Sequence, residues 1–138
     1  MQGRTLFPSL CRDGVTSATM VNSPDPAVAQ RAAIVLQARM ASTRLPGKAL
    51  ADVNGRPILE HCIERLRATS MLPIVVATTE RKDDDALAEA ASHLGVEVVR
   101  GPDADVLSRF VLVVRRLELT ALIRATADNP AVNAIWCP

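Results

Sequence analysis

Short apolar runs alternate with helix-forming segments from residue 32 onward, and this alternation is the strongest constraint on the fold. Runs rich in Val, Ile, Leu and Ala have the length of strands, and amphipathic stretches separate them. Such alternation predicts an α/β fold with a doubly wound, mostly parallel, Rossmann-like sheet. The predicted strands are residues 32–36, 74–78, 96–100 and 120–126, and the predicted helices begin near residues 57, 83 and 105.

The order of these strands decides which loops share a crevice. If the order is 3-2-1-4, counted along the chain, strands one and four are neighbours at the topological switch point. Loops that leave the carboxyl ends of parallel strands there open into the crevice where α/β proteins bind ligands. We therefore expect the loop after residue 36 and the turn after residue 126 to face one site.

The loop after the first predicted strand is rich in cations. Residues 37–48 read QARMASTRLPGK and contain Arg39, Arg44 and Lys48. Arginine offers planar forked donors and lysine a mobile point charge, a combination that suits a polyphosphate. The alternative for such a run is a solvated surface loop. The position directly after a buried strand favours phosphate binding.

Two well-known phosphate motifs are excluded. A P-loop would align on Gly47 and Lys48, but Ser42 takes the place of its first glycine and Ala49 that of its hydroxyl residue. A dinucleotide fingerprint needs three glycines, and this loop has only Gly47. The loop is therefore expected to hold its anion with side chains more than with bare backbone.

Asp128 follows the fourth predicted strand, in the sequence Ala-Asp-Asn-Pro. Magnesium prefers one or two carboxylates together with phosphate oxygens and water, so a carboxylate beside a bound polyphosphate would suit this ion. The alternative is a plain turn, since Asp, Asn and Pro all favour turns.

Local signals predict further details. Asp83, Asp84 and Asp85 open the second helix, where we expect them to complement the helix dipole rather than to bind metal, because three consecutive residues do not face one point. Residues 49–53 are expected to be extended and to end in an Asn54-Gly55 turn. In the third helix, the residues expected to face the sheet are Val106, Leu107, Phe110, Val114 and Leu117.

Composition bears on partners and location. The net charge is +1 and aromatic residues make up 2%, which leaves neither a basic footprint nor a stacking platform for nucleic acid. The three cysteines are widely spaced without a CxxC pair, so neither a disulfide framework nor a zinc site is indicated. No apolar run reaches the length of a membrane span and no signal peptide is evident, so we expect a cytoplasmic location and no membrane partner. Residues 1–30 are expected to be a disordered or poorly ordered extension.

Four motifs in a fixed order resemble a known family. The segment QARMASTRLPGKAL, followed by DVNGRP, is similar to the signature of the CTP-dependent sugar nucleotidyltransferases. The nearest types are the spore-coat polysaccharide enzymes and, next, the 3-deoxy-manno-octulosonate (Kdo) and acylneuraminate cytidylyltransferases. The later landmarks are VVATT at 75–79, RGPDADVLSR at 100–109 and RATADNP at 124–130. The likeness covers about residues 33–133 and only the N-terminal part of the family.

The resemblance implies a reaction as well as a fold. It implies a nucleotide-diphospho-sugar transferase fold, truncated at its C-terminus, with residues 31–138 as the nucleotide-binding part. It implies transfer of CMP from CTP to a sugar or sugar acid, with release of pyrophosphate, in polysaccharide or glycoconjugate biosynthesis. Mg²⁺ would be the cofactor, and CTP and a small sugar the partners. The full-length family implies a homodimer, with acceptor contacts, a second metal ligand and the dimer surface expected beyond Pro138.

Residue roles carry over on the matching motifs. Arg39, Lys48 and Asp128 would be catalytic, with Asp128 as the metal ligand in a Gly-Asp-x-Pro context where this chain has Ala127. Thr78 and Thr79 match the stretch that reads the pyrimidine edge in the similar enzymes, and Arg109 matches a segment of the nucleotide or sugar pocket. The residues implied in nucleotide binding are Ala38, Arg39, Ser42, Arg44, Lys48, Thr78, Thr79 and Arg109.

Two alternatives stay open at this point. The first is that the chain is a catalytically incomplete, nucleotide-binding remnant of such an enzyme, and the second is that it is a nucleotidyltransferase that uses a different base. Pyrophosphate release from CTP with a panel of sugar acids separates the enzyme from the remnant, and competition among the four nucleotides tests the base.

Overall fold

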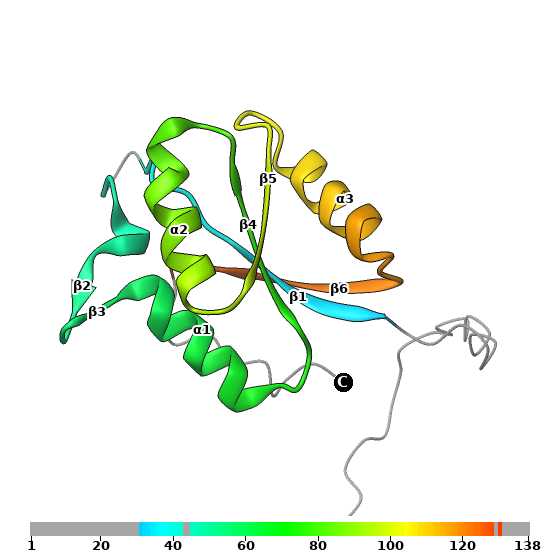
Figure 1. The fold of residues 1–138 in the computed structure, drawn as a ribbon, viewed down its shortest axis with the longest axis horizontal. Coiled ribbons are helices and arrows are strands. Elements are labelled where there is room, and N and C mark those ends of the chain that lie inside the picture. Colours follow the sequence, from blue (N-terminus) through cyan, green and yellow to red (C-terminus); the bar gives the residue numbers. More distant parts are fainter. Residues whose placement is uncertain (1–30, 43–44, 129, 131–138) are drawn as a thin grey trace, which may run out of the picture.

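A parallel sheet flanked by helices forms the body of the molecule in the computed structural model (Figure 1). The structure describes residues 31–42, 45–128 and 130. The predicted extension over residues 1–30 lies outside the described residues, as does Arg44. The strands of the sheet are β1 (Ala32–Gln37), β4 (Ile74–Thr79), β5 (Glu97–Gly101) and β6 (Ala121–Thr126), and the α-helices are α1 (Ile58–Thr69), α2 (Asp85–His93) and α3 (Val106–Leu117).

The strand order confirms the topology predicted from the sequence. The sheet runs β5-β4-β1-β6, with every neighbouring pair parallel, which is the order 3-2-1-4 for the predicted strands. Strand β1 lies between β4 and β6, and its last residue, Gln37, pairs with Ala77 on one side and Thr126 on the other. Strand β4 is buried along its whole length, as expected for a central strand covered on both faces. The carboxyl ends of β1 and β6 therefore lie next to each other.

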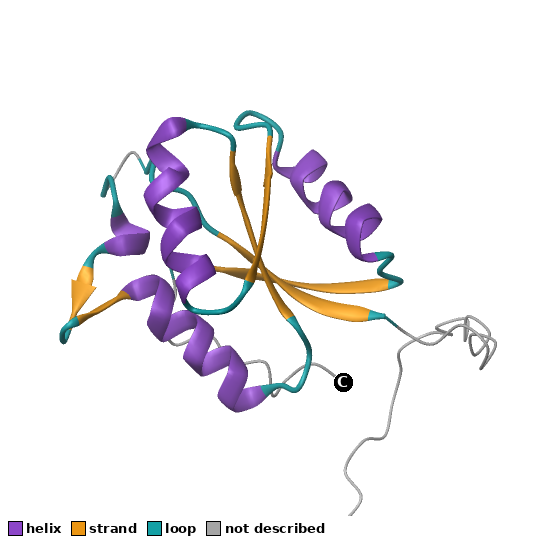
Figure 2. Ribbon diagram, in the orientation of Figure 1, coloured by secondary structure: helices purple, strands orange, loops and turns teal. Residues whose placement is uncertain are grey.

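Two apolar layers hold the helices on the sheet, and Figure 2 shows α1 and α2 on one side of it and α3 on the other. Alternate residues of β1 supply both layers. Ile34 packs in the cluster that contains Leu59 of α1 and Leu87 of α2, whereas Val35 packs with Phe110 of α3. Alternation along the strand thus covers both faces of the sheet.

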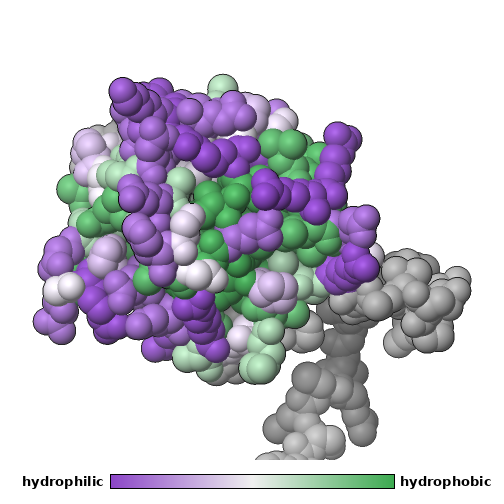
Figure 3. Space-filling model, in the orientation of Figure 1, coloured by the Kyte–Doolittle hydropathy of each residue, from purple (hydrophilic) through white to green (hydrophobic). Residues whose placement is uncertain are grey.

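In helix α3 the prediction that Leu107 faces the sheet is wrong. Leu107 is 71% exposed, whereas Arg109 is buried beside Phe110 and Val113. The reason is geometric: Leu107 lies about 100° around the helix from Val106, outside the stripe of Val106, Phe110 and Val113 that faces the sheet. Figure 3 shows hydrophobic surface among hydrophilic residues in the region of α3.

The segment between β1 and α1 also differs in part from the prediction. Lys48–Leu50 form a 3-10 helix, η1, rather than an extended piece. Strand β2 (Asp52–Val53) then pairs with β3 (Arg56–Pro57) in a small antiparallel ribbon. Asn54 and Gly55 both have positive φ, as the predicted Asn-Gly turn requires. Among the described residues, no helix is long and apolar enough to cross a membrane.

Candidate functional site

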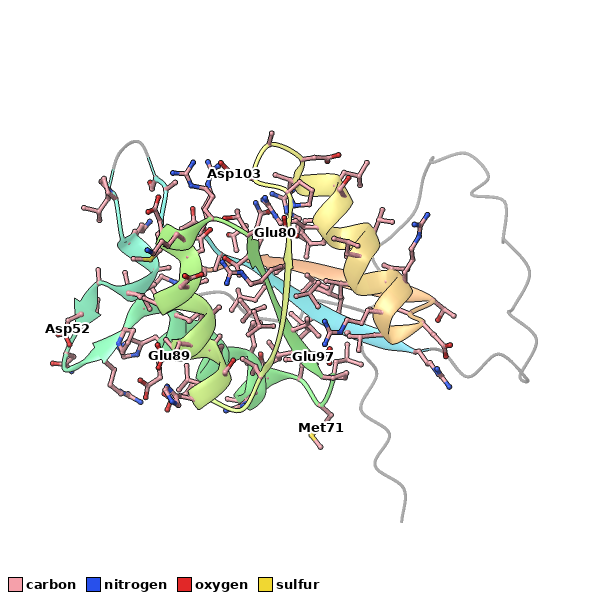
Figure 4. All side chains as sticks on the ribbon, turned by 45° about the horizontal axis from the view of Figure 1, so that its top comes forward. Asp52, Met71, Glu80, Glu89, Glu97 and Asp103 are labelled. Carbon is pink, nitrogen blue, oxygen red and sulfur yellow. The ribbon has the colours of Figure 1, made fainter. Side chains whose placement is uncertain are left out.

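A cavity of about 460 Å³ opens where β1 and β6 end. Its walls come from the segment after β1, the start of η1, the last part of β6 and the turn after it. The lining residues are Gln37, Ala38, Arg39, Ser42, Leu45, Lys48, Ala49, Arg124, Thr126, Ala127 and Asp128. The site lies at the carboxyl ends of neighbouring parallel strands, where α/β folds bind ligands. In Figure 4 the labelled residues Glu80 and Asp103 mark this edge of the sheet, because they follow β4 and β5. Met71, which precedes β4, lies at the opposite edge.

The cavity brings together distant parts of the cationic loop. Arg39 and Lys48 both line it, and neither forms an ion pair with any described residue. Other arginines do have such partners; Arg56, for example, pairs with Glu64 at 2.6 Å. Cations that line a concave surface without a paired carboxylate are suited to an anionic ligand.

Ala38 and Ser42 also line the cavity, but their polar groups are partly engaged. The amide of Ala38 donates to the carbonyl of Ala77 at 3.1 Å, which extends the pairing of β1 with β4. The hydroxyl of Ser42 accepts from the amide of Leu45 at 3.4 Å. The amide of Ala38 is therefore committed to the sheet, and Ser42 keeps its hydroxyl hydrogen as a donor.

Asp128, in the turn after β6, lines the same cavity as the cationic loop. The turn that carries it is tied to β1, since the amide of Ala127 donates to the carbonyl of Gln37 at 3.0 Å. Beneath the site, Cys62 of α1 is fully buried, and its thiol pKa is raised to about 11. Burial is the main cause; the charge of Asp128 raises this pKa further and the charge of Lys48 lowers it. The pKa of this thiol thus responds to the charges of both Lys48 and Asp128, which line the cavity.

The donor set fits magnesium only with help from a ligand. Within the described part of the chain, no group of at least three His, Cys, Asp or Glu side chains is arranged to hold a metal ion. Among the described residues, Asp128 is the one carboxylate that lines the cavity, beside Arg39 and Lys48. Magnesium commonly binds one or two carboxylates together with substrate phosphates and waters, so this arrangement fits an ion that arrives with a polyphosphate.

Three of the predicted nucleotide-binding residues lie outside the cavity lining. Thr78 and Thr79 are fully buried, and the hydroxyl of Thr79 donates to Asp84. Arg109 is 1% exposed, and its guanidinium donates to the carbonyls of Pro102 at 2.6 Å and Asp103 at 3.0 Å. Arg109 thus fastens the loop between β5 and α3, a role for which the sequence offers no local signal.

The structure adds Arg124, which sequence reasoning did not single out. It lies on β6, lines the cavity, and places its guanidinium carbon 5.9 Å from the centre of the Phe110 ring. A cation over an aromatic face is favourable and helps to orient the side chain. Period-two alternation along the last strand, which puts Arg124 on the same face as Thr126, is the signal that would have suggested it.

The prediction that Asp83, Asp84 and Asp85 all complement the dipole of α2 is only partly right. Asp85 lies in the first turn of α2 and pairs with Arg100 at 2.7 Å, and Asp83 pairs with Arg81 at 2.8 Å. Asp84 makes no capping hydrogen bond to α2; instead it is buried and accepts from the amide of Met40 at 2.6 Å. Sequence spacing could not show this contact, because its partners are 44 residues apart.

Comparison with known proteins agrees with this geometry. The family model described as cytidylyltransferase matches residues 32–135, which include the cationic loop, all four strands of the sheet and Asp128. The chain belongs to the cytidylyltransferase family. The spore coat polysaccharide biosynthesis protein SpsF of Bacillus subtilis is 36% identical over 104 residues, which cover 72% of this chain and 43% of that protein.

Solved cytidylyltransferase structures have the same fold. A cytidylyltransferase from Leptospira borgpetersenii serovar Hardjo-bovis superposes with a TM-score of 0.72 at 35% identity, covering 76% of this chain and 44% of that one. A CMP:2-keto-3-deoxy-manno-octonic acid synthetase complexed with CTP superposes with a TM-score of 0.65 at 27% identity, covering 75% and 43%. The chain thus spans less than half the length of the cytidylyltransferases that it matches.

Proposed function

We propose that residues 31–138 are the nucleotide-binding part of a CTP-dependent sugar cytidylyltransferase. The observation that carries this proposal is that Arg39 and Lys48, from one loop, line a single cavity with Asp128, from the end of the neighbouring strand. A triphosphate brings several negative charges to such a cavity, and both cations have donors for its oxygens. The CTP-bound synthetase, which superposes on three quarters of this chain, supports the choice of nucleotide.

The proposed reaction transfers CMP to a sugar or sugar acid. The anomeric hydroxyl of the acceptor attacks the α-phosphorus of CTP, the bond to the β-phosphate oxygen breaks, and pyrophosphate leaves. This chemistry depends on positioning and on charge neutralisation rather than on a covalent intermediate. Arg39 and Lys48 neutralise the charge that builds up on the departing pyrophosphate, and Ser42 donates its hydroxyl to a phosphate oxygen. Arg44 is proposed as a further cation of the same loop.

Asp128 is proposed as the ligand for Mg²⁺. When bound, the ion would neutralise phosphate charge and orient the triphosphate. Arg124 adds a positive charge on the β6 side of the cavity, where it would hold an anionic group of the nucleotide or of the acceptor. We assign no triphosphate contact to Thr78, Thr79 or Arg109, because their side chains are buried in the fold.

The names of two relatives support a proposal for the acceptor and the pathway. The Bacillus subtilis relative is named for spore coat polysaccharide biosynthesis, and the synthetase for a sugar acid, so we propose an acidic or modified sugar as the acceptor in polysaccharide biosynthesis. A cytoplasmic location and a homodimer of the full-length protein complete the proposal. Cell fractionation and light scattering test these two points.

Calorimetric titration of CTP, ATP, GTP and UTP, each with and without Mg²⁺, tests the nucleotide. A pyrophosphate-release assay with 3-deoxy-manno-octulosonate and other sugar acids tests the reaction. The expected result is a preference for CTP that depends on Mg²⁺, with release stimulated by one class of acceptor. Binding without release would identify a nucleotide-binding remnant, tighter binding of another base would change the substrate, and a chain that binds no nucleotide would refute the proposal.

A further inference from the structure

Asp84 is a buried carboxylate that the proposed function leaves unused. It ends the short 3-10 helix η2 (Lys82–Asp84) between β4 and α2, and it is 1% exposed. A buried carboxylate is unfavourable unless hydrogen bonds compensate for its lost hydration. Here one oxygen, Oδ1, accepts from the backbone amide of Met40 at 2.6 Å, and the other, Oδ2, accepts from the hydroxyl of Thr79.

The contact with Met40 continues toward both cavity cations. The carbonyl of Met40 accepts from the amide of Gly47 at 2.9 Å. Arg39 directly precedes Met40, and Lys48 directly follows Gly47. Gly47 has a φ of 74°, a left-handed conformation that glycine adopts without strain. A series of hydrogen bonds thus runs from Asp84 to the residues adjacent to both cations.

The other side of Asp84 is anchored in the sheet. Thr79 is the last residue of β4 and is fully buried. Its carbonyl accepts from Nε of Arg100 at 2.8 Å, and its hydroxyl accepts from the amide of Arg81 at 3.2 Å. Asp84 therefore connects a rigid strand end to the backbone of the cationic loop. In Figure 1 the segment after β1 lies beside the beginning of α2, as this contact requires.

We propose that Asp84 is a positioning residue for anion binding. It holds the amide of Met40, and through Met40 the amide of Gly47, so that Arg39 and Lys48 point into the same cavity. Asp84 is not one of the residues that line the cavity. Its effect on affinity is indirect, because it fixes the two ends of the loop before the ligand arrives and so lowers the ordering cost of binding. This inference rests on the proposed binding of a triphosphate in the cavity.

A pair of similar-sized substitutions tests the role of the hydrogen bonds. In Asp84→Asn the amide oxygen can still accept from Met40 and the NH₂ can donate to the hydroxyl of Thr79, whereas Asp84→Leu fills a similar volume without an acceptor. We expect Asp84→Asn to bind CTP and inorganic tripolyphosphate within about threefold of the unchanged chain. We expect Asp84→Leu to bind both about tenfold to a hundredfold more weakly, the scale of effects from misplaced binding groups.

A control variant separates positioning from general destabilisation. Val113→Ala removes buried volume on the α3 face of the sheet, away from the loop, and lowers the melting temperature without touching Asp84. It should keep its affinity for CTP at temperatures where it is folded. Amide exchange at Met40 and Gly47, followed by NMR, should accelerate in Asp84→Leu and stay slow in Asp84→Asn and Val113→Ala.

Each outcome decides one of the two proposals. If the unchanged chain binds neither CTP nor tripolyphosphate, the anion site is wrong and the role of Asp84 is lost with it. If the unchanged chain binds and Asp84→Leu binds equally well, only the positioning role is refuted. An equal loss of affinity in Val113→Ala also refutes it. Should Asp84→Leu not fold, Thr79→Val removes the donor to Oδ2 and takes its place; affinity unchanged in that variant counts against the proposal.

Discussion

Replacing Lys48 with alanine removes one ammonium group from the cavity with little effect on the backbone. Lys48 begins η1, where its amide donates to the carbonyl of Leu45 at 3.3 Å and its carbonyl accepts from the amide of Ala51 at 3.1 Å. These contacts do not involve the side chain, and no described residue forms an ion pair with it. The loss therefore falls on the ligand rather than on the fold.

The size of the effect follows from the interaction lost. A hydrogen bond to a charged group contributes about 1.5 to 3 kcal/mol, so Lys48→Ala should weaken CTP binding by about tenfold to 150-fold. Arg39→Ala should have an effect of the same order, since Arg39 lines the same cavity. The melting temperature of the ligand-free chain should change little, because surface substitutions usually alter stability by less than about 0.5 kcal/mol.

Calorimetric titration of CTP at two salt concentrations measures this effect. The difference between the unchanged chain and Lys48→Ala should shrink at high salt, because screening weakens an exposed charge contact. Arg115→Ala, which removes an exposed cation of α3 that does not line the cavity, is the matched control. Equal affinity in Lys48→Ala and Arg115→Ala would show that the loop does not bind the triphosphate.

Four further predictions concern Asp128, Cys62 and Gly101. Asp128→Asn should abolish the Mg²⁺ dependence of CTP binding with little change in melting temperature; a large drop in melting temperature with the metal dependence kept would support a plain turn instead. Because burial raises the pKa of the Cys62 thiol to about 11 from 9.0, its alkylation at pH 8, followed by mass spectrometry, should be slow until the chain unfolds. The same shift means that Cys62 contributes stability below about pH 9 that is lost as the pH rises toward 11, a decline that Cys62→Ala should lack in thermal melts at graded pH. Gly101→Ala would place Cβ 2.8 Å from Cδ1 of Leu112 and 3.1 Å from Cγ of Arg109, so chemical denaturation should show a loss of about 1 to 3 kcal/mol, and an unchanged midpoint would mean that α3 can shift at little cost.

The sequence by itself determined the elements and their order. Apolar runs of strand length and amphipathic helices are local patterns, set by which side chains face a neighbouring layer, so they can be read over a few residues. The Asn54-Gly55 turn is local in the same sense, and the structure has it. Strand order 3-2-1-4 then brought Arg39, Lys48 and Asp128 to one edge of the sheet, and these residues do line one cavity.

Only the tertiary structure decided which polar side chains serve the fold and which face the cavity. Arg109 and Thr79 lie in motifs that suggested a role in nucleotide binding, yet both are buried. The guanidinium of Arg109 donates to loop carbonyls, and the hydroxyl of Thr79 donates to Asp84. Arg124 faces the cavity because the pleat of β6 and the ring of Phe110 place it there. In the sequence Asp84 cannot be distinguished from its neighbours Asp83 and Asp85, and its hydrogen-bond partner Met40 is 44 residues away. Hydrogen-bond partners of this kind depend on how strands and loops meet in space, and no local pattern encodes them.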